Sequence, residues 1–186
     1  VFGSSVYVCG YTNYQSSLPS KAVLIKIDTS GVIQWQKGLG ITGGIMSFTG
    51  MDIDSSGNIY VAGTYYNSSS IGHGVVAKYN SSGTLQFQKL YSFGNSDIFF
   101  SLDIDTQTNN LIIGGTMTII VGQNSGLSVL LDSGGNFISG TTYTRNSGSI
   151  FAQFTKAVFN STTKSLYFVG KTYESPVSSG YRQLIA

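Results

Sequence analysis

Short apolar runs that end in glycine and follow a polar turn recur along the chain. The four runs are VYVCG, IYVAG, LIIGG and LYFVG, and their closing glycines are Gly10, Gly63, Gly115 and Gly170. These glycines lie 53, 52 and 55 residues apart. Runs of this length, rich in Val, Ile, Leu and Tyr and bounded by turn residues, are typical of buried β-strands. The spacing therefore predicts an all-β fold built from a repeat of about 52–55 residues.

Three further strand signals accompany each glycine-ended run. One lies before the run, as SFTGMDID (47–54), FFSLDID (99–105) and FTKAVFN (154–160). A second follows the run, as AVLIKID (22–28), GVVAKYN (74–80) and LSVLLD (127–132). The last strand signal is VIQWQK (32–37), TLQFQK (84–89) and NFISGT (136–141). Four strands per repeat, joined by short turns, predict four-stranded antiparallel sheets.

The turn between the third and fourth strands is the most regular feature of the sequence. Its copies, Asp28-Thr-Ser-Gly31, Asn80-Ser-Ser-Gly83 and Asp132-Ser-Gly-Gly135, recur at intervals of 52 residues. Asp or Asn at the first position accepts hydrogen bonds from backbone N–H groups two residues on, and glycine at the fourth position adopts a positive φ. The pattern predicts a tight hairpin in each copy.

The fourth strand carries a large apolar side chain in each copy. Trp35, Phe87 and Ile138 are predicted to occupy one equivalent position. An aromatic side chain at a fixed place is expected where neighbouring sheets pack face to face. Four antiparallel strands per repeat, with turn glycines in register, are the signature of β-propeller blades. A solenoid of stacked small sheets is the alternative architecture.

The stretch DSSGNIYVAGT…GVVAKYNSSGTLQFQK resembles the SBBP-type β-propeller repeat, which is found in large secreted or surface proteins, often bacterial. Repeats of that family show an Asp-x-x-Gly-Asn turn, a Tyr-Val-x-Gly strand and an aromatic outer strand. The resemblance is best in 51–105 and weakens after residue 106, where DTQTNN and NSTTKS lack the turn glycine. It implies a propeller fold and no particular activity, because propellers carry many functions.

The strand signals amount to about three and a half blades. We expect a partial blade over 1–46, complete blades over 47–97 and 98–151, and a partial blade over 152–186. The first blade lacks an inner strand and the last lacks an outer strand, so a ring of these blades alone leaves strand edges exposed. We therefore predict that the chain is part of a longer polypeptide. A homodimer that pools its blades in one ring is the alternative.

The composition argues against several classes of partner. Charged residues make up 10% of the chain, against roughly 25% in an ordinary soluble domain, and the net charge is only +2. The basic residues are scattered, so we expect no nucleic-acid partner. The chain has no run of 18 apolar residues, so we expect no membrane span. The single cysteine, Cys9, lies in an apolar strand and is expected to be a small buried side chain.

The best candidate for a metal site is Asp52-x-Asp54-x-Ser56-Gly57, which resembles the front half of a calcium loop. Such a loop requires a glutamate at its twelfth position, where this chain has Gly63. We interpret this stretch, and the related pair Asp103-x-Asp105, as turns.

The one histidine, His73, stands between two glycines and is interpreted as a loop residue. A zinc site or a Ser-His-Asp triad requires further ligands or an activated serine, and the sequence offers no such pattern. Phosphate-binding and dinucleotide motifs are also missing from the sequence. We predict no catalytic residue, no metal, no cofactor and no enzyme activity.

The loops after the glycine-ended runs are rich in Tyr and Ser, a composition favoured in recognition surfaces. They comprise 12–20, 64–70 and 171–179. Their tyrosines are the candidate partner-binding residues: Tyr14, Tyr65, Tyr66 and Tyr173. Ordinary permissive surface loops are the alternative interpretation. The same turns and loops hold three candidate N-glycosylation sites, at Asn67, Asn80 and Asn160.

These observations favour a non-enzymatic structural or interaction module of a large extracellular, cell-surface or virion-surface assembly. Its expected partner is a protein, a glycan or other copies of the chain, bound through loops at the rim of the blades. Two alternatives remain. One is a propeller domain that binds or processes carbohydrate, and the other is an intracellular scaffold.

Overall fold

The computed structural model describes residues 3–12, 20–120, 123–144, 149–160, 162–175 and 182–185. All fourteen elements in these ranges are β-strands. Antiparallel pairing joins them, in chain order, into four sheets that we call blades 1 to 4. The all-β fold built of four-stranded antiparallel sheets is therefore confirmed.

Blades 1 and 4 have three described strands each, and blades 2 and 3 have four. Blade 1 comprises β1 (Ser5–Thr12), β2 (Lys21–Asp28) and β3 (Ile33–Leu39). Blade 2 comprises β4 (Ile45–Ile53), β5 (Ile59–Tyr66), β6 (Gly72–Tyr79) and β7 (Leu85–Tyr91). Blade 3 comprises β8 (Ser96–Ile104), β9 (Leu111–Ile120), β10 (Gln123–Leu131) and β11 (Phe137–Tyr143). Blade 4 comprises β12 (Ser149–Asn160), β13 (Ser165–Ser175) and β14 (Arg182–Ile185).

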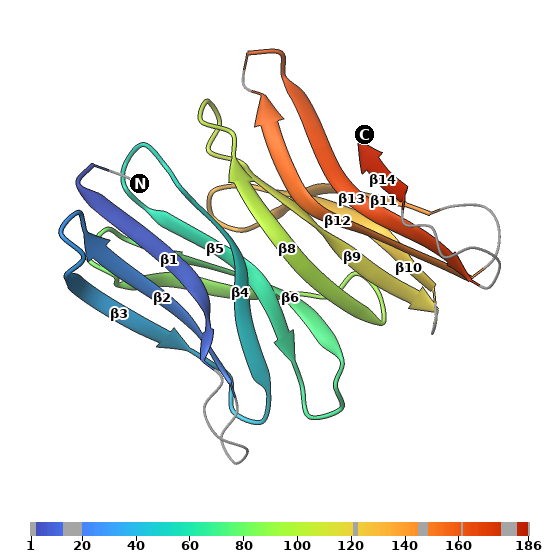
Figure 1. The fold of residues 1–186 in the computed structure, drawn as a ribbon, viewed down its shortest axis with the longest axis horizontal. Coiled ribbons are helices and arrows are strands. Elements are labelled where there is room, and N and C mark those ends of the chain that lie inside the picture. The colour runs from blue at the N-terminus through green and yellow to red at the C-terminus, as the bar shows by residue number, and fades with distance from the viewer. Residues whose placement is uncertain are drawn as a thin grey trace.

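The blades stand side by side in chain order (Figure 1). Blades 3 and 4 share a backbone pairing, in which Asn124 of β10 lies parallel to Phe151 of β12. Blades 1 and 4 lie at opposite ends of the row, so the described residues form an open array and not a closed ring (Figure 1).

In blades 2, 3 and 4 the closing glycine of the apolar run is required by a bulge in the strand beside it. In blade 2 the register between β4 and β5 shifts between Phe48 and Gly50. The bulge brings the backbone of β4 so close that a Cβ atom on Gly63 would overlap the carbonyl oxygen of Ser47. Gly115 and Gly170 face the corresponding carbonyl groups in blades 3 and 4. Only a residue without a side chain fits this place, which explains why glycine recurs there.

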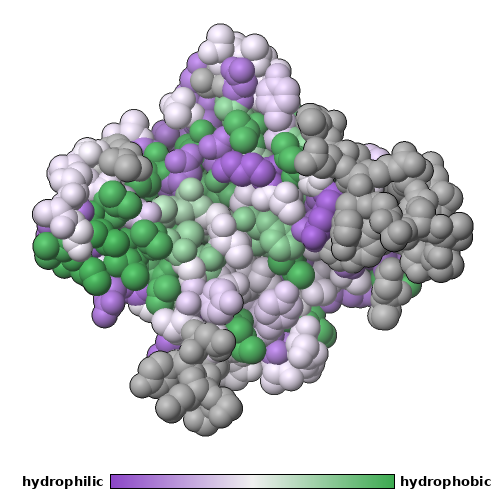
Figure 2. Space-filling view, in the orientation of Figure 1, coloured by the Kyte–Doolittle hydropathy of each residue, from purple (hydrophilic) through white to green (hydrophobic). Residues whose placement is uncertain are grey.

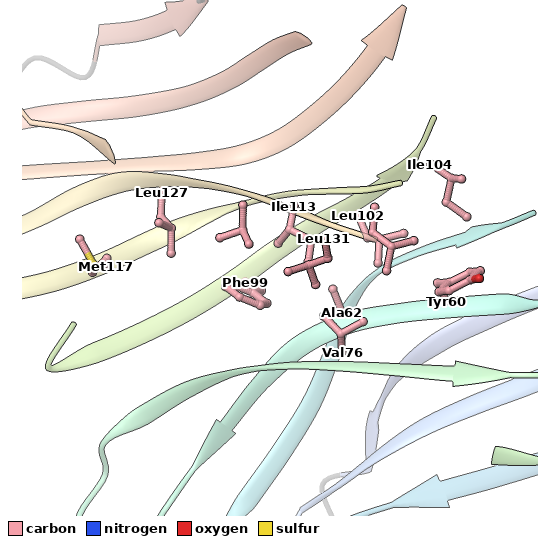
Figure 3. Packing of buried hydrophobic residues seen from close by; sticks show 12 residues of the cluster. Tyr60, Ala62, Val76, Phe99, Leu102, Ile104, Ile113, Met117, Leu127 and Leu131 are labelled. Carbon is pink, nitrogen blue, oxygen red and sulfur yellow. The ribbon is translucent and has the colours of Figure 1, made fainter. Parts of the chain in front are cut away.

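The second strand of blades 2 and 3 is buried on both faces. In β5 every residue from Ile59 to Tyr65 is buried, and β9 is buried from Leu111 to Met117. The core between blades 2 and 3 illustrates the reason (Figure 3). Tyr60, Ala62 and Val76 of blade 2 pack there against side chains from β8, β9 and β10. Because alternate residues of a strand point to opposite faces, the other residues of β5 pack against blade 1.

In blades 1 and 2 an aromatic ring of the outer strand contacts the hairpin turn of the next blade. Phe87 of β7 contacts Gly135 in the turn between β10 and β11, and Trp35 of β3 contacts Gly83 in the turn between β6 and β7. Tyr91 strengthens the first of these contacts by donating its hydroxyl to the Gly135 carbonyl, at 2.7 Å. Burial raises the pKa of Tyr91, so this hydroxyl stays protonated and remains a donor.

The prediction that Ile138 shares the position of Trp35 and Phe87 is wrong. Trp35 pairs with Lys26, Phe87 pairs with Lys78, and Ser139 pairs with Leu130 in the same register. Ile138 lies one residue earlier, at the bulge that shifts the register next to the turn. Because a shift of one residue moves a side chain to the other face of a strand, the place of the aromatic ring is taken by Ser139 in blade 3.

The two roles of a turn glycine can be separated by mutation. Gly31 and Gly135 both have a positive φ, of 87° and 74°. A Cβ atom on Gly31 meets nothing within 4 Å, whereas one on Gly135 lies 2.9 Å from the Phe87 ring. We expect Gly31→Ala to lower the free energy of unfolding by about 1–2 kcal/mol through backbone strain alone. Gly135→Ala is expected to cost about 1–3 kcal/mol more, because the ring must move. Urea unfolding curves of the two variants measure the difference, and equal losses would contradict a packing role for the contact.

Candidate functional site

Two carboxylates come together on the inner strands of blades 2 and 3. Asp52 lies in β4 and Asp103 lies in β8, so the interpretation of both residues as turn residues is wrong. One oxygen of Asp52 accepts the N–H of Ile53 at 2.8 Å, and the other accepts the N–H of Ile104, in blade 3, at 3.0 Å. Asp103 accepts the N–H of Phe159, in blade 4, at 2.7 Å. Each carboxylate therefore bridges its own blade to the next.

The inner strands are also linked by hydroxyl groups. Thr49 of β4 donates its hydroxyl to the carbonyl of Phe99 in β8, at 2.7 Å. Ser101 of β8 accepts the N–H of Ala157 in β12, at 2.9 Å. An inner strand has a continuous backbone ladder on one side only, and the other side has at most the single pairing of Phe151 with Asn124. Unpaired backbone groups are costly to bury. The side chains of the inner strands supply the missing partners on the other side.

The pairing of the two carboxyls changes the acidity of Asp52. Burial raises the pKa of Asp52 above its ordinary value, and the neighbouring Asp103 raises it further through a hydrogen bond and its negative charge. The N–H groups of Ile53 and Ile104 oppose this effect, because they favour the ionised form. The net result is that the pKa of the Asp52 carboxyl is raised.

The other described aspartates hold turns or loops. Asp28, Asp54 and Asp132 each accept backbone N–H groups two and four residues later, which closes their turns. Asp105 closes the turn of 105–109 with the help of the Thr108 hydroxyl. Asp97 is fully buried and accepts the N–H groups of Phe93 and Gly94. The interpretation of Asp54 and Asp105 as turn residues is confirmed.

His73 lies in β6 and not in a loop, and it is part of a polar cluster at one rim. Its Nδ1 atom lies 2.7 Å from the Ser92 hydroxyl, and its Nε2 atom lies 3.5 Å from the side-chain nitrogen of Asn67. The imidazole also stacks on the Tyr65 ring. Both ring nitrogens have partners within the chain, and neither is bonded to a carboxylate.

The tyrosines proposed for partner binding differ in accessibility. Tyr65 is in strand β5 with 8% of its surface exposed, so the prediction of an exposed loop side chain is wrong at this position. Tyr66, at the end of β5, is half-buried. Tyr14 and the side chain of Tyr173 lie outside the described residues. The exposed large hydrophobic side chains described at this rim include Ile71, Phe93, Ile119 and Ile120.

Each candidate glycosylation site caps a turn with its side-chain oxygen. Asn67 and Asn80 each accept backbone N–H groups two and four residues later, and both are half-buried. Asn160 accepts the N–H groups of Thr162 and Thr163 and is exposed. In this arrangement the side-chain oxygen holds the turn, and the side-chain nitrogen is the atom to which a glycan is attached.

The described residues offer neither a metal-binding cluster nor a membrane-spanning helix. They contain no group of three or more His, Cys, Asp or Glu side chains that is able to hold a metal ion. Nor do they include a helix long and apolar enough to cross a membrane. Cys9 is half-buried, and burial raises the pKa of its thiol.

Comparison with known proteins supports the repeat. Residues 34–64 match the family model of the SBBP β-propeller repeat, which confirms the resemblance for this part of the chain. The matched residues run from β3 of blade 1 through β5 of blade 2. They contain Trp35, the bulge of β4, Asp52 and the closing Gly63. No match to the chain was found among curated proteins.

The carboxyl pair predicts a characteristic pH dependence. Asp52→Asn keeps an acceptor for the Ile104 N–H, loses the one for the Ile53 N–H and removes the charge. Because burial is the largest influence on Asp52 and disfavours the charge, we expect this variant to be at least as stable as the wild type at pH 7. Because the folded state raises the pKa of Asp52, the wild type gains stability as the pH falls and the group is protonated. The advantage of the variant is therefore expected to shrink towards about pH 4. Asp52→Ala leaves the N–H without an acceptor and is expected to lose about 1–3 kcal/mol.

Asp28→Asn provides a control of opposite sign. The N–H of Val32 and the Ser30 hydroxyl lower the pKa of Asp28, so its carboxylate contributes stability above pH 4 that is lost on acidification. Asp28→Asn should be less stable than the wild type at pH 7, and this deficit should shrink as the pH falls. Chemical unfolding at pH 4, 5.5 and 7 tests both variants. A deficit of Asp52→Asn at pH 7 that disappears on acidification would contradict the assigned role of Asp52.

Proposed function

We propose that the chain is a non-enzymatic structural or interaction module of a larger assembly outside the cell or on a cell or virion surface. Its partner is a protein or a glycan, bound at the rim that carries the loops. The match to a β-propeller repeat supports a non-catalytic repeat domain. The extracellular location and the binding of a partner are the further content of the proposal.

This proposal rests on the hydrogen bonds that the aspartate side chains accept. Every aspartate of the chain holds backbone N–H groups, either within a turn or loop or between neighbouring blades. A catalytic carboxylate must be free to exchange a proton with substrate or to attack it. Carboxylates that serve as backbone acceptors instead support a scaffold.

The pair of Asp52 and Asp103 is the feature closest to an acid–base site. Glycosidases use two carboxyls of different roles on either side of the scissile bond. Here each carboxyl is tied to the next blade, Asp52 to Ile104 and Asp103 to Phe159. This arrangement supports a joining role for the pair over carbohydrate processing.

The rim that carries the loops differs from the opposite rim in the kind of connection between its strands. We call it the loop rim and define it by 40–44, 66–71, 92–95 and 119–120. Ile120 is 59% exposed at this rim, and Ile71 is 40% exposed. The opposite rim consists of the tight turns that begin at Asp28, Asp54, Asn80, Asp105, Asp132 and Asn160. Exposed aliphatic side chains beside polar loops suit a partner-binding surface.

The faces at the two ends of the array support a role within an assembly. Val8 of blade 1 corresponds to Val61 of blade 2, yet Val8 is 45% exposed and Val61 is fully buried. Tyr167 of blade 4 corresponds to Tyr60, and it is 44% exposed where Tyr60 is fully buried. Figure 2 shows apolar side chains gathered at the end of the molecule where blade 1 lies. Apolar sheet faces of this kind are expected to be covered by further sheets in an assembly.

Partner binding at the loop rim can be tested with matched variants. We expect Ile71→Ser combined with Ile120→Ser to weaken binding to a partner at least about tenfold, because both remove exposed apolar contact area. Val32→Ser is the control, since Val32 is 57% exposed at the opposite rim. A glycan array and affinity capture from extracts of the source organism's surface, followed by titration of whatever binds, provide the measurement. Equal binding by both variants and the wild type would contradict the loop rim as the site.

The location of the protein gives a separate test. If it follows a eukaryotic secretory route, Asn160 is expected to carry a glycan, because it is exposed in a sequon turn. The intact mass of the native protein should then fall on enzymatic deglycosylation and stay unchanged in Asn160→Gln, provided Asn67 and Asn80 are not occupied. In any organism, a membrane-impermeant amine reagent added to whole cells or virions should label its lysines. Labelling only after lysis would contradict the surface location.

A further inference from the structure

An aromatic side chain fills the contact between blades at two equivalent places. Between blades 1 and 2, Trp35 packs against Tyr7 and the core of that contact, with the Trp35 and Tyr7 ring centroids 6.0 Å apart. Between blades 2 and 3, Phe87 packs against the core formed around Tyr60. Both rings come from the outer strand of the earlier blade, and both touch the hairpin turn of the later blade.

The third contact, between blades 3 and 4, has a groove in this place. Ser139 takes the position of Trp35 and Phe87, and its short side chain leaves the space open. The groove has a volume of about 160 Å³. Its apolar wall consists of the side chains of Ile112, Leu130, Leu166 and Phe168.

Three wall residues of the groove correspond to residues of the site that holds Trp35. Ile112 stands where Tyr7 stands in blade 1, because both lie three residues before the closing glycine. By the same count from that glycine, Leu166 and Phe168 correspond to Ile59 and Val61, which pack in the core beside Trp35. The shape of the groove is therefore that of a site from which an aromatic ring has been removed. Leu166 is 42% exposed, whereas Ile59 is fully buried and pairs with Tyr79 of the same core.

We propose that this groove binds the aromatic side chain of a protein partner, with tryptophan or phenylalanine as its occupant. The site is separate from the loop rim, so it does not depend on binding there. The occupant is argued from the chain itself, which places an indole or a phenyl ring in the two equivalent sites. Burial of such a ring against apolar walls is favourable because it removes apolar surface from water.

The size and polarity of the groove fit this occupant. Apolar protein cavities of about 150 Å³ stay dry and bind benzene, and the groove is of similar volume. The Trp35 Nε1 atom is buried without a hydrogen-bond partner in its own site. The groove contains the hydroxyls of Ser139 and Thr141, which are acceptors for an indole N–H. An indole is therefore expected to bind at least as well as a phenyl ring.

The test uses N-acetyl-tryptophanamide as a probe of the side chain, titrated into the ¹⁵N-labelled 186-residue chain. We expect saturable shifts of the amide signals of Leu130, Ser139 and Phe168, with a Kd in the millimolar range. N-acetyl-leucinamide, which is apolar but not aromatic, is expected to bind at least fivefold more weakly. No saturable shift at these amides, or equal binding of the two amides, would overturn the proposal.

Variants at Ser139 provide the matched control. Ser139→Trp and Ser139→Phe place a ring in the groove from within the chain, as in blades 1 and 2. Both are expected to abolish the probe-dependent shifts and to raise Tm, whereas Ser139→Ala keeps the groove and should keep binding. Ser139→Phe is included in case the larger indole does not fit. Probe binding to the folded Ser139→Phe protein with unchanged affinity would show that the ring binds elsewhere, and the proposal would fail.

Discussion

Each blade of this protein has two apolar faces, and only a neighbouring sheet can cover each of them. In β5, Tyr60 faces blade 3 and Val61 faces blade 1, and both are fully buried. A single four-stranded sheet with these residues would leave one or both faces in water, so the blades are stable only as an array. This constraint explains why the second strand of each repeat is a continuous apolar run and does not alternate between apolar and polar residues.

Packing of the apolar faces leaves backbone N–H groups on the edges of the inner strands without partners. Polar side chains of the neighbouring blade accept these N–H groups. The N–H of Ile104 is taken by Asp52, and the N–H of Ala157 is taken by Ser101. The result is a set of bridges between blades that replaces a backbone ladder. In these bridges Asp52 and Asp103 use their carboxylate oxygens to hold backbone N–H groups of the next blade. The low content of charged residues is consistent with a chain whose few acids have structural tasks.

Local features of the fold were predictable, and contacts between blades were not. The hairpin at Asp132 follows from four adjacent residues, and the glycine-ended strands follow from their spacing. The bridge from Asp52 to blade 3 depends on a residue 52 positions away, so the Asp-x-Asp pattern alone could not distinguish it from a turn. Tyr65 belongs to a Tyr- and Ser-rich stretch that suggests a loop, but the β5 ladder continues through it and the core of blades 1 and 2 buries its ring.

The error at Ile138 shows why a register matters more than a residue type in such repeats. Ile138 lies one residue from the position that corresponds to Trp35 and Phe87. Because Ile138 is also a large apolar residue, similarity of residue type alone predicts it as their equivalent. Counting from the turn glycine, however, Trp35, Phe87 and Ser139 all lie four residues after it. This count could have identified the missing ring from the sequence. The copies of a repeat pack alike. If one copy has a short side chain where the others have a large one, the contact between its blade and the next contains an open space. Such a position is more informative about binding than the positions at which all the copies agree.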